Sequence, residues 1–118
     1  MYAYKDNIEN LGINMNKVNE RFNGDYGLIK KFFIDFTMDC NFIKLKKAVS
    51  ENNCNEAFIA AHTLKGICDE LYIEGFGDII CRISYLLKDG NIKPVYEIMP
   101  EAERAYKVLS ETLKTMFG

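Results

Sequence analysis

The chain contains a single histidine, His62, so its histidine chemistry is confined to one site. This count excludes a metal centre built from several histidines, and it excludes any mechanism that needs two of them. On a helical wheel, Leu71 lies roughly 180° from His62 and Leu64 about 200° away. We therefore expect an exposed imidazole on the outward side of a helix whose other side is buried.

The residues that share a helix face with His62 supply charge, open space and apolar surface. Lys65 follows at i+3, within reach of a negative charge built on the imidazole. Gly66 follows at i+4, where a mid-helix glycine costs about 1 kcal/mol relative to alanine, and a surface cleared for close approach would explain it. Phe58 and Ile59 add apolar groups that suggest a docking surface. From spacing alone, a solvated histidine without function is an equal alternative.

The four cysteines do not point to a second reactive centre. Their separations along the chain are 14, 14 and 13 residues, and no two of them form a C-x-x-C pair. A zinc site requires closely spaced ligand pairs, so this pattern predicts no metal site. We expect ordinary buried thiols. They are Cys40, Cys54, Cys68 and Cys81.

Composition describes one globular domain in which these side chains must be positioned. The chain has 118 residues, of which 48% are hydrophobic and 27% charged, with a net charge of −2. A single domain over residues 1–118 is the usual organisation at this length. The small acidic surplus argues against a nucleic-acid partner. There is neither an apolar run long enough to span a bilayer nor the apolar stretch of a signal peptide, so we expect a cytoplasmic protein without a membrane association.

Hydrophobic residues recur with a period close to 3.6, which predicts helices and no sheet. Four longer helices are predicted over residues 26–52, 55–72, 76–89 and 92–117, preceded by one or two short helices over residues 2–11 and 15–22. Pro100 should kink or break the last helix, because proline removes a backbone hydrogen bond. The prediction is an all-α, antiparallel four-helix bundle.

The segment Ala61 to Gly66 reads A-H-T-L-K-G and resembles the signature of the histidine-containing phosphotransfer (HPt) domains of two-component phosphorelays. Two other segments fit the same family. Glu20 to Asp25 resembles the R-F-G-G-D turn before the family's first long helix, and Asp89-Gly90-Asn91 falls where the family often has a Gly-Asp turn. The predicted helix lengths also resemble that family's four-helix bundle.

The resemblance implies a phosphoryl carrier rather than an enzyme with its own ATP hydrolysis. His62 would accept a phosphoryl group from the aspartyl phosphate of a receiver domain and pass it to another receiver. Lys65 would stabilise the added charge, and Gly66 would let the partner approach. The partners implied are a response-regulator receiver, a hybrid histidine kinase, or both, with the chain as a monomer. No cofactor is implied for this chain, because the Mg²⁺ belongs to the receiver.

The sequence departs from the family pattern after Gly66. Asp69 stands where glycine is common, only about 20° from His62 on the wheel. It can pair with Lys65 at i+4, and it puts negative charge on a face that must meet an acidic receiver. Tyr72 replaces another usual glycine, which affects how the helix ends.

Two alternatives follow. The first is an HPt-like bundle that binds a receiver or kinase without carrying phosphate, for which Asp69 is the motive. The second is an unrelated structural bundle, which predicts that His62 is buried or capped by Phe58.

Overall fold

A computed structural model describes residues 11–118, and within this range 81% of the residues lie in helices and none in a strand. The prediction of an all-α chain is therefore confirmed for this part. Of the helix expected over residues 2–11, only Leu11 is described, and it lies in a turn. The helices are α2 (Met15–Arg21), α3 (Tyr26–Met38), α4 (Asn41–Ser50), α5 (Cys54–Glu70), α6 (Glu74–Lys88) and α7 (Lys93–Phe117).

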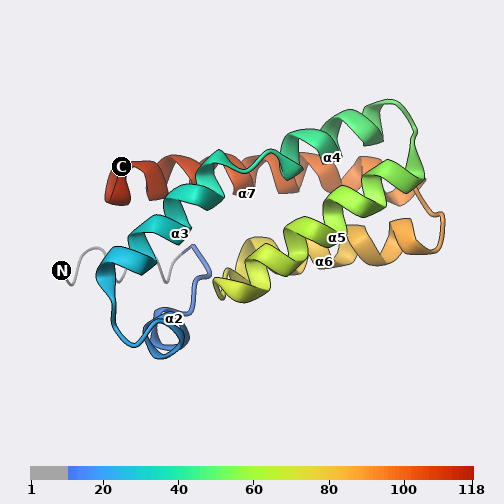
Figure 1. Cartoon of the computed structure of the whole chain (residues 1–118). Helices are drawn as coiled ribbons and strands as arrows, with labels where there is room; N and C mark the ends of the chain where they lie inside the picture. Colours follow the sequence, from blue (N-terminus) through green and yellow to red (C-terminus); the bar gives the residue numbers. More distant parts are fainter. Residues whose placement is uncertain (1–10) are drawn as a thin grey trace.

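The helices α4, α5, α6 and α7 alternate in direction, whereas α3 and α4 run in the same general direction (Figure 1). The most extensive packing is that of α5 against α4 on one side and α6 on the other, while α7 packs against α6 and α3. The short helix α2 lies at the end of the molecule where α5 turns into α6. The described part is elongated, with extents of 43 × 22 × 19 Å. The helix that carries His62 is thus flanked by two neighbours along its length.

The predicted helix over residues 26–52 is wrong, because it is two helices separated at Asp39 and Cys40. Asp39 leaves the helical region, with ψ at 140°. Its carboxylate Oδ2 accepts the backbone N–H of Asn41 at 2.9 Å, and its two oxygens accept the Asn41 side-chain amide. A short acidic side chain that bonds a nearby backbone N–H in this way favours a helix start over a helix interior.

The break also shifts the phase of the buried face. An unbroken helix over residues 26–52 would place Cys40 and Ile43 on the same face as the buried Phe36, but Cys40 is exposed and Ile43 is 66% exposed. Phe42 and Leu45 are buried in their place. A continuous helical period cannot be extrapolated across a residue with extended backbone.

The other boundaries differ by smaller amounts. The predicted helix start at residue 76 is wrong, because α6 begins at Glu74 and includes Gly75 and Gly77. The break expected before Pro100 is also wrong, because α7 continues through that exposed proline. The milder outcome, a kink within a continuous helix, stays a prediction.

Residue types that favour helix ends cap three of the helices. The side chain of Asn14 accepts the N–H of Lys17 at the start of α2, and Asp25 accepts that of Leu28 at the start of α3. Gly90 follows α6 with φ at +79°, as a glycine after a helix C-terminus commonly does.

The inner face of α5 is built from small and apolar side chains. Five of them, spaced four, three, four and three residues apart, are buried. They are Ala57, Ala61, Leu64, Cys68 and Leu71. With the buried Ala60 they let α4 and α6 pack closely against α5. This packing fixes the rotation of α5 and thereby decides which of its residues face solvent.

Candidate functional site

His62 lies on the exposed side of α5, as the helical wheel predicts. The ring of Phe58, one turn earlier, stacks against the imidazole with centroids 5.5 Å apart and planes 22° from parallel. Phe58 is itself only partly buried. The alternative of an unrelated structural bundle predicts an imidazole that is buried or capped by Phe58. Phe58 does cover one face of the ring, but His62 is not buried.

Lys65 is paired with Asp69, not with the histidine. Its Nζ lies 3.0 Å from Asp69 Oδ2 on the same helix, in the i,i+4 pairing expected from the sequence. The hydrogen bond and charge of Asp69 raise the pKa of Lys65 above 10.5. The lysine side chain is 34% exposed and that of Asp69 65% exposed, so the pair lies at the surface. Lys65 is therefore fully charged at neutral pH and already engaged.

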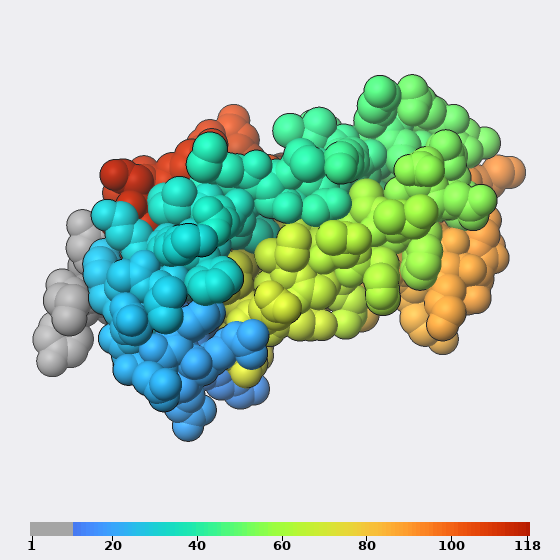
Figure 2. All heavy atoms as spheres, viewed as in Figure 1, coloured from blue at the N-terminus to red at the C-terminus, as the bar shows by residue number. Residues whose placement is uncertain are grey.

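The two remaining positions on this face are open. A Cβ placed on Gly66 would meet nothing within 4 Å, so the surface one turn after His62 is clear. Ile59 is 57% exposed on the side of α5 that faces α4. In Figure 2 the yellow-green surface of α5 is open beside the green surface of α4. A partner can therefore approach the imidazole without displacing a side chain at Gly66.

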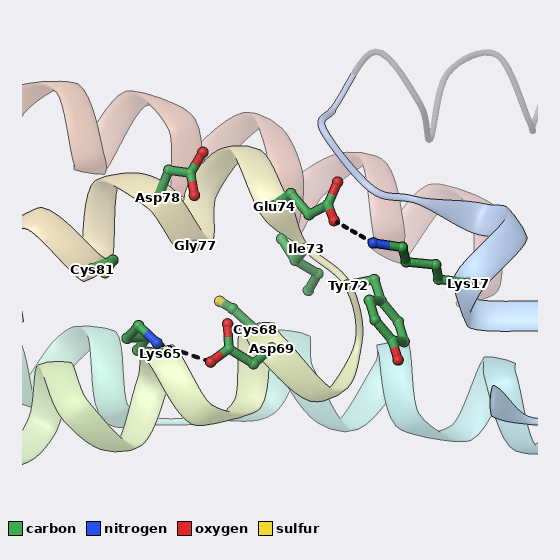
Figure 3. A pocket seen from close by; sticks show the side chains of 10 residues that line it. All are labelled: Lys17, Lys65, Cys68, Asp69, Tyr72, Ile73, Glu74, Gly77, Asp78 and Cys81. Carbon is green, nitrogen blue, oxygen red and sulfur yellow. Dashed lines mark hydrogen bonds and ion pairs between the residues drawn. The ribbon is translucent and has the colours of Figure 1, made fainter.

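A polar groove of about 540 Å³ runs between α5 and α6 and ends at α2. Figure 3 shows the Lys65–Asp69 pair on α5, with Asp78 and Cys81 on α6 across from it. At the α2 end, Lys17 lies 3.7 Å from Glu74. The groove is lined by Lys17, Lys65, Cys68, Asp69, Tyr72, Ile73, Glu74, Gly77, Asp78 and Cys81.

A second groove, of about 360 Å³, lies on the other side of α5, against α4. It places Lys44 and Lys47 of α4 beside Ile59 and Glu56 of α5. By helical geometry, His62 lies on the ridge between the two grooves. These lysines were missed by the sequence interpretation, although their i,i+3 spacing on a predicted helix was visible in it.

Tyr72 follows the C-terminus of α5 and takes part in the hydrogen bonds that end this helix. The N–H of Ile73 donates to the carbonyl of Cys68 at 2.9 Å, and that of Tyr72 to the carbonyl of Asp69 at 3.3 Å. This pair of bonds is a Schellman motif, which places the intervening residue in the left-handed region. Tyr72 accordingly has φ at +52°, a conformation that glycine adopts at less energetic cost.

The cysteines are free and only partly match the prediction of buried thiols. Cys68 is buried, Cys54 and Cys81 are partly buried, and Cys40 is exposed because of the break between α3 and α4. Burial raises the pKa of the Cys68 thiol to about 12. Among residues 11–118, no group of three or more His, Cys, Asp or Glu side chains is placed to hold a metal ion. Within the same range, no helix has the length and apolar character needed to cross a membrane.

Comparison of the chain with protein-family models, with curated proteins and with solved structures finds no match.

Proposed function

We propose that this chain is a phosphoryl carrier of a two-component phosphorelay, with His62 as the phosphorylated residue. One observation carries the proposal: the sequence A-H-T-L-K-G lies on α5 with its imidazole exposed and with open space at Gly66. A carrier histidine must reach into another protein's active site, and this position meets that requirement. We further propose that the chain works as a monomer in the cytoplasm.

The transfer step requires only the imidazole on this side. The lone pair of His62 Nε2 attacks phosphorus in the aspartyl phosphate of a receiver domain, while Nδ1 keeps its proton. A P–N bond forms as the P–O bond to the aspartate breaks, and the carboxylate leaves with the electron pair. The reverse sequence of bond changes passes the phosphoryl group to the next receiver aspartate.

The other groups that the transfer needs come partly from the receiver domain and partly from this chain. Phosphoryl transfer is catalysed mainly by positioning and by neutralising charge. The receiver's Mg²⁺ and acidic pocket supply most of both, so no cofactor is assigned to this chain. Lys65 adds one positive charge near the phosphoryl group, and Gly66 admits the receiver. Phe58 and Ile59 give the receiver apolar surface beside the histidine, with Asp69 at its edge.

The helix arrangement supports the same proposal. In Figure 1, α4, α5, α6 and α7 alternate in direction, and α3, which precedes the break at Asp39, packs against α7. We infer that these helices correspond to the four-helix bundle of HPt domains, with its first long helix divided into α3 and α4.

The test is phosphotransfer from a radiolabelled receiver. A set of receiver domains from the same genome is phosphorylated, and each is incubated with the wild-type chain and with the His62→Gln variant. The proposal expects label to pass from at least one receiver to the wild-type chain and none to pass to the variant. Label that survives His62→Gln would overturn it, as would the absence of transfer from every receiver.

A second candidate is a binding module that docks a receiver or kinase without carrying phosphate. The Lys65–Asp69 pair favours it, because the lysine that would stabilise the phosphoryl group is already paired with a carboxylate. This candidate expects receiver binding that is unchanged by His62→Ala, together with no transfer from any receiver tested. Calorimetric titration of the same receivers separates it from the carrier.

A further inference from the structure

The two groups that the proposed function requires are held in opposite directions along α5. The imidazole of His62 stacks on Phe58, toward the start of the helix. The ammonium of Lys65 is bonded to Asp69, toward its end. Within residues 11–118, no hydrogen bond connects Lys65 to His62.

We infer that Asp69 is a positioning residue that holds Lys65 away from His62, so that a phosphoryl group on His62 gains the lysine only by breaking the Lys65–Asp69 pair. The inference rests on the proposed function and describes the regulation of the same site. Asp69 thereby lowers the stability of phosphorylated His62 relative to the next acceptor, and the chain favours onward transfer over storage of the phosphoryl group.

The groups around Lys65 favour the paired state. Asp69 faces it from its own helix, and Asp78 lines the same groove from α6. The buried thiol of Cys68 and the thiol of Cys81 line the same groove between α5 and α6. The other lysine of the groove, Lys17, lies at the α2 end and pairs with Glu74. Asp69 is therefore the carboxylate that holds Lys65 in the paired state.

Asp69 is much farther from His62 than from Lys65, so it acts on a phosphoryl group at His62 mainly through the lysine. It follows His62 by seven residues, which is about 10 Å along the helix axis. That separation exceeds the Debye length of ~8 Å at physiological ionic strength, so direct repulsion of a phosphoryl group at His62 is largely screened. The contact of Asp69 with Lys65, at 3.0 Å, is much shorter. The main effect of Asp69 therefore passes through Lys65.

An exposed i,i+4 ion pair is weak, so the expected effect is modest. Releasing Lys65 should raise the equilibrium constant for phosphorylation of His62 by about two- to five-fold. The effect should disappear when Lys65 is absent, because Asp69 then has nothing to hold.

The test measures phosphoryl exchange between His62 and free imidazole, which needs no receiver. The full chain is equilibrated with N-phosphoimidazole and imidazole, and phosphorus NMR gives the ratio of phosphorylated protein to phosphorylated imidazole. The variants are Asp69→Asn, Asp69→Glu, Lys65→Met and the double variant Asp69→Asn with Lys65→Met. The chain also offers a matched control in the Lys31–Asp35 pair of α3, an exposed i,i+4 pair at 3.1 Å.

The inference expects Asp69→Asn to raise the exchange constant about two- to five-fold, and it expects Asp69→Glu and Asp35→Asn to leave it near the wild-type value. In the Lys65→Met background, Asp69→Asn should have no effect. An unchanged constant in Asp69→Asn overturns the inference. So does a rise that persists without Lys65, because Asp69 would then act by direct repulsion. Failure of every variant and of the wild type to phosphorylate at His62 overturns the proposed function as well, so the two failures are distinguishable.

Discussion

Gly12 lies against Gly75 so closely that a Cβ built on Gly12 would be 2.7 Å from the backbone of Gly75. The carbonyl of Gly12 accepts the N–H groups of Glu74 and Gly75 at 2.7 and 3.1 Å. These are the first two N–H groups of α6, which has no side-chain cap. The backbone of Gly12 thus takes the place of a capping side chain and anchors the segment before α2 to the turn between α5 and α6.

Gly12→Ala should therefore lower the free energy of unfolding by about 2–4 kcal/mol, from steric overlap with Gly75 and from its φ of +80°. Gly24→Ala is the matched control, because Gly24 has φ at +69° but nothing within 4 Å of its added Cβ. It should cost only about 1–2 kcal/mol. Urea unfolding of both variants measures the difference. Equal losses would show that the approach of Gly12 to Gly75 is not tight.

Gly66 should separate folding from partner access. Gly66→Leu places a side chain in open space on a helix, so it should stabilise the fold by up to about 1 kcal/mol. The same variant should still accept phosphate from phosphoramidate, a small donor, yet lose at least tenfold in the rate of transfer from a receiver. Thermal unfolding and the two transfer assays check this. Unchanged receiver transfer would contradict the proposed approach over Gly66.

Tyr72 should be strained by its positive φ. Tyr72→Gly and Tyr72→Ala both remove the ring, which lies 5.8 Å from Lys17 Nζ, but only glycine relieves the backbone. Tyr72→Gly should therefore be more stable than Tyr72→Ala by about 1 kcal/mol. Denaturant midpoints of the two variants give this difference directly. If alanine were the more stable, the Schellman ending of α5 would be incorrect.

Pro100 should be a source of instability within α7. It is exposed in the helix interior, where it donates no hydrogen bond to the preceding turn. Pro100→Ala should raise the free energy of unfolding by roughly 2 kcal/mol, less than the full propensity difference because proline also restricts the unfolded chain. Pro94→Ala, in the first turn of α7, should give no such gain. Comparable gains from both variants would contradict this interpretation.

Alkaline pH should destabilise the fold. The pKa of Cys68 rises from 9.0 to about 12 on burial, and the pKa of Lys65 and that of Tyr106 are also raised, by Asp69 and by burial respectively. A group with a raised pKa binds more protons in the folded state, so its stabilisation is complete below the unfolded pKa and is lost as the pH rises toward the folded pKa. Urea midpoints should therefore fall between pH about 9 and about 12.

Cys68→Ala tests the share of the thiol in this pH dependence. It should flatten the fall, whatever its effect on stability at neutral pH. An unchanged slope would assign the dependence to other groups. The exposed Cys40 provides an internal check, since it should react with a thiol reagent in the native state while Cys68 does not.

The face of α5 could be predicted from sequence because the helix is uninterrupted and its buried side chains keep one period. The exposure of His62 and the pairing of Lys65 with Asp69 both follow from that period. The break at Asp39 was not predicted, because it depends on whether the helix continues or the Asp39 carboxylate accepts hydrogen bonds from Asn41 instead. The signal was present in Asp39-Cys40-Asn41 and was outweighed by the apolar pattern around it.

The two grooves beside α5 could not be predicted, because they depend on which helices become its neighbours. Lys44 of α4 lines the groove between α4 and α5, and Asp78 of α6 lines the groove between α5 and α6. The stack of Phe58 on His62 could be predicted only in part. Its i,i+4 spacing was visible, whereas the orientation of the two rings required coordinates.

The interruption at Asp39 also divides the molecule into parts that can open separately. α3 packs on α7, whereas α4 and α6 cover α5 from both sides. A fluctuation that releases α3 therefore leaves the amide hydrogen bonds of α5 protected, and stability is distributed unevenly along the chain. His62 is carried by α5, which has the most extensive packing of the described helices, so we expect its amides to exchange more slowly than those of α3.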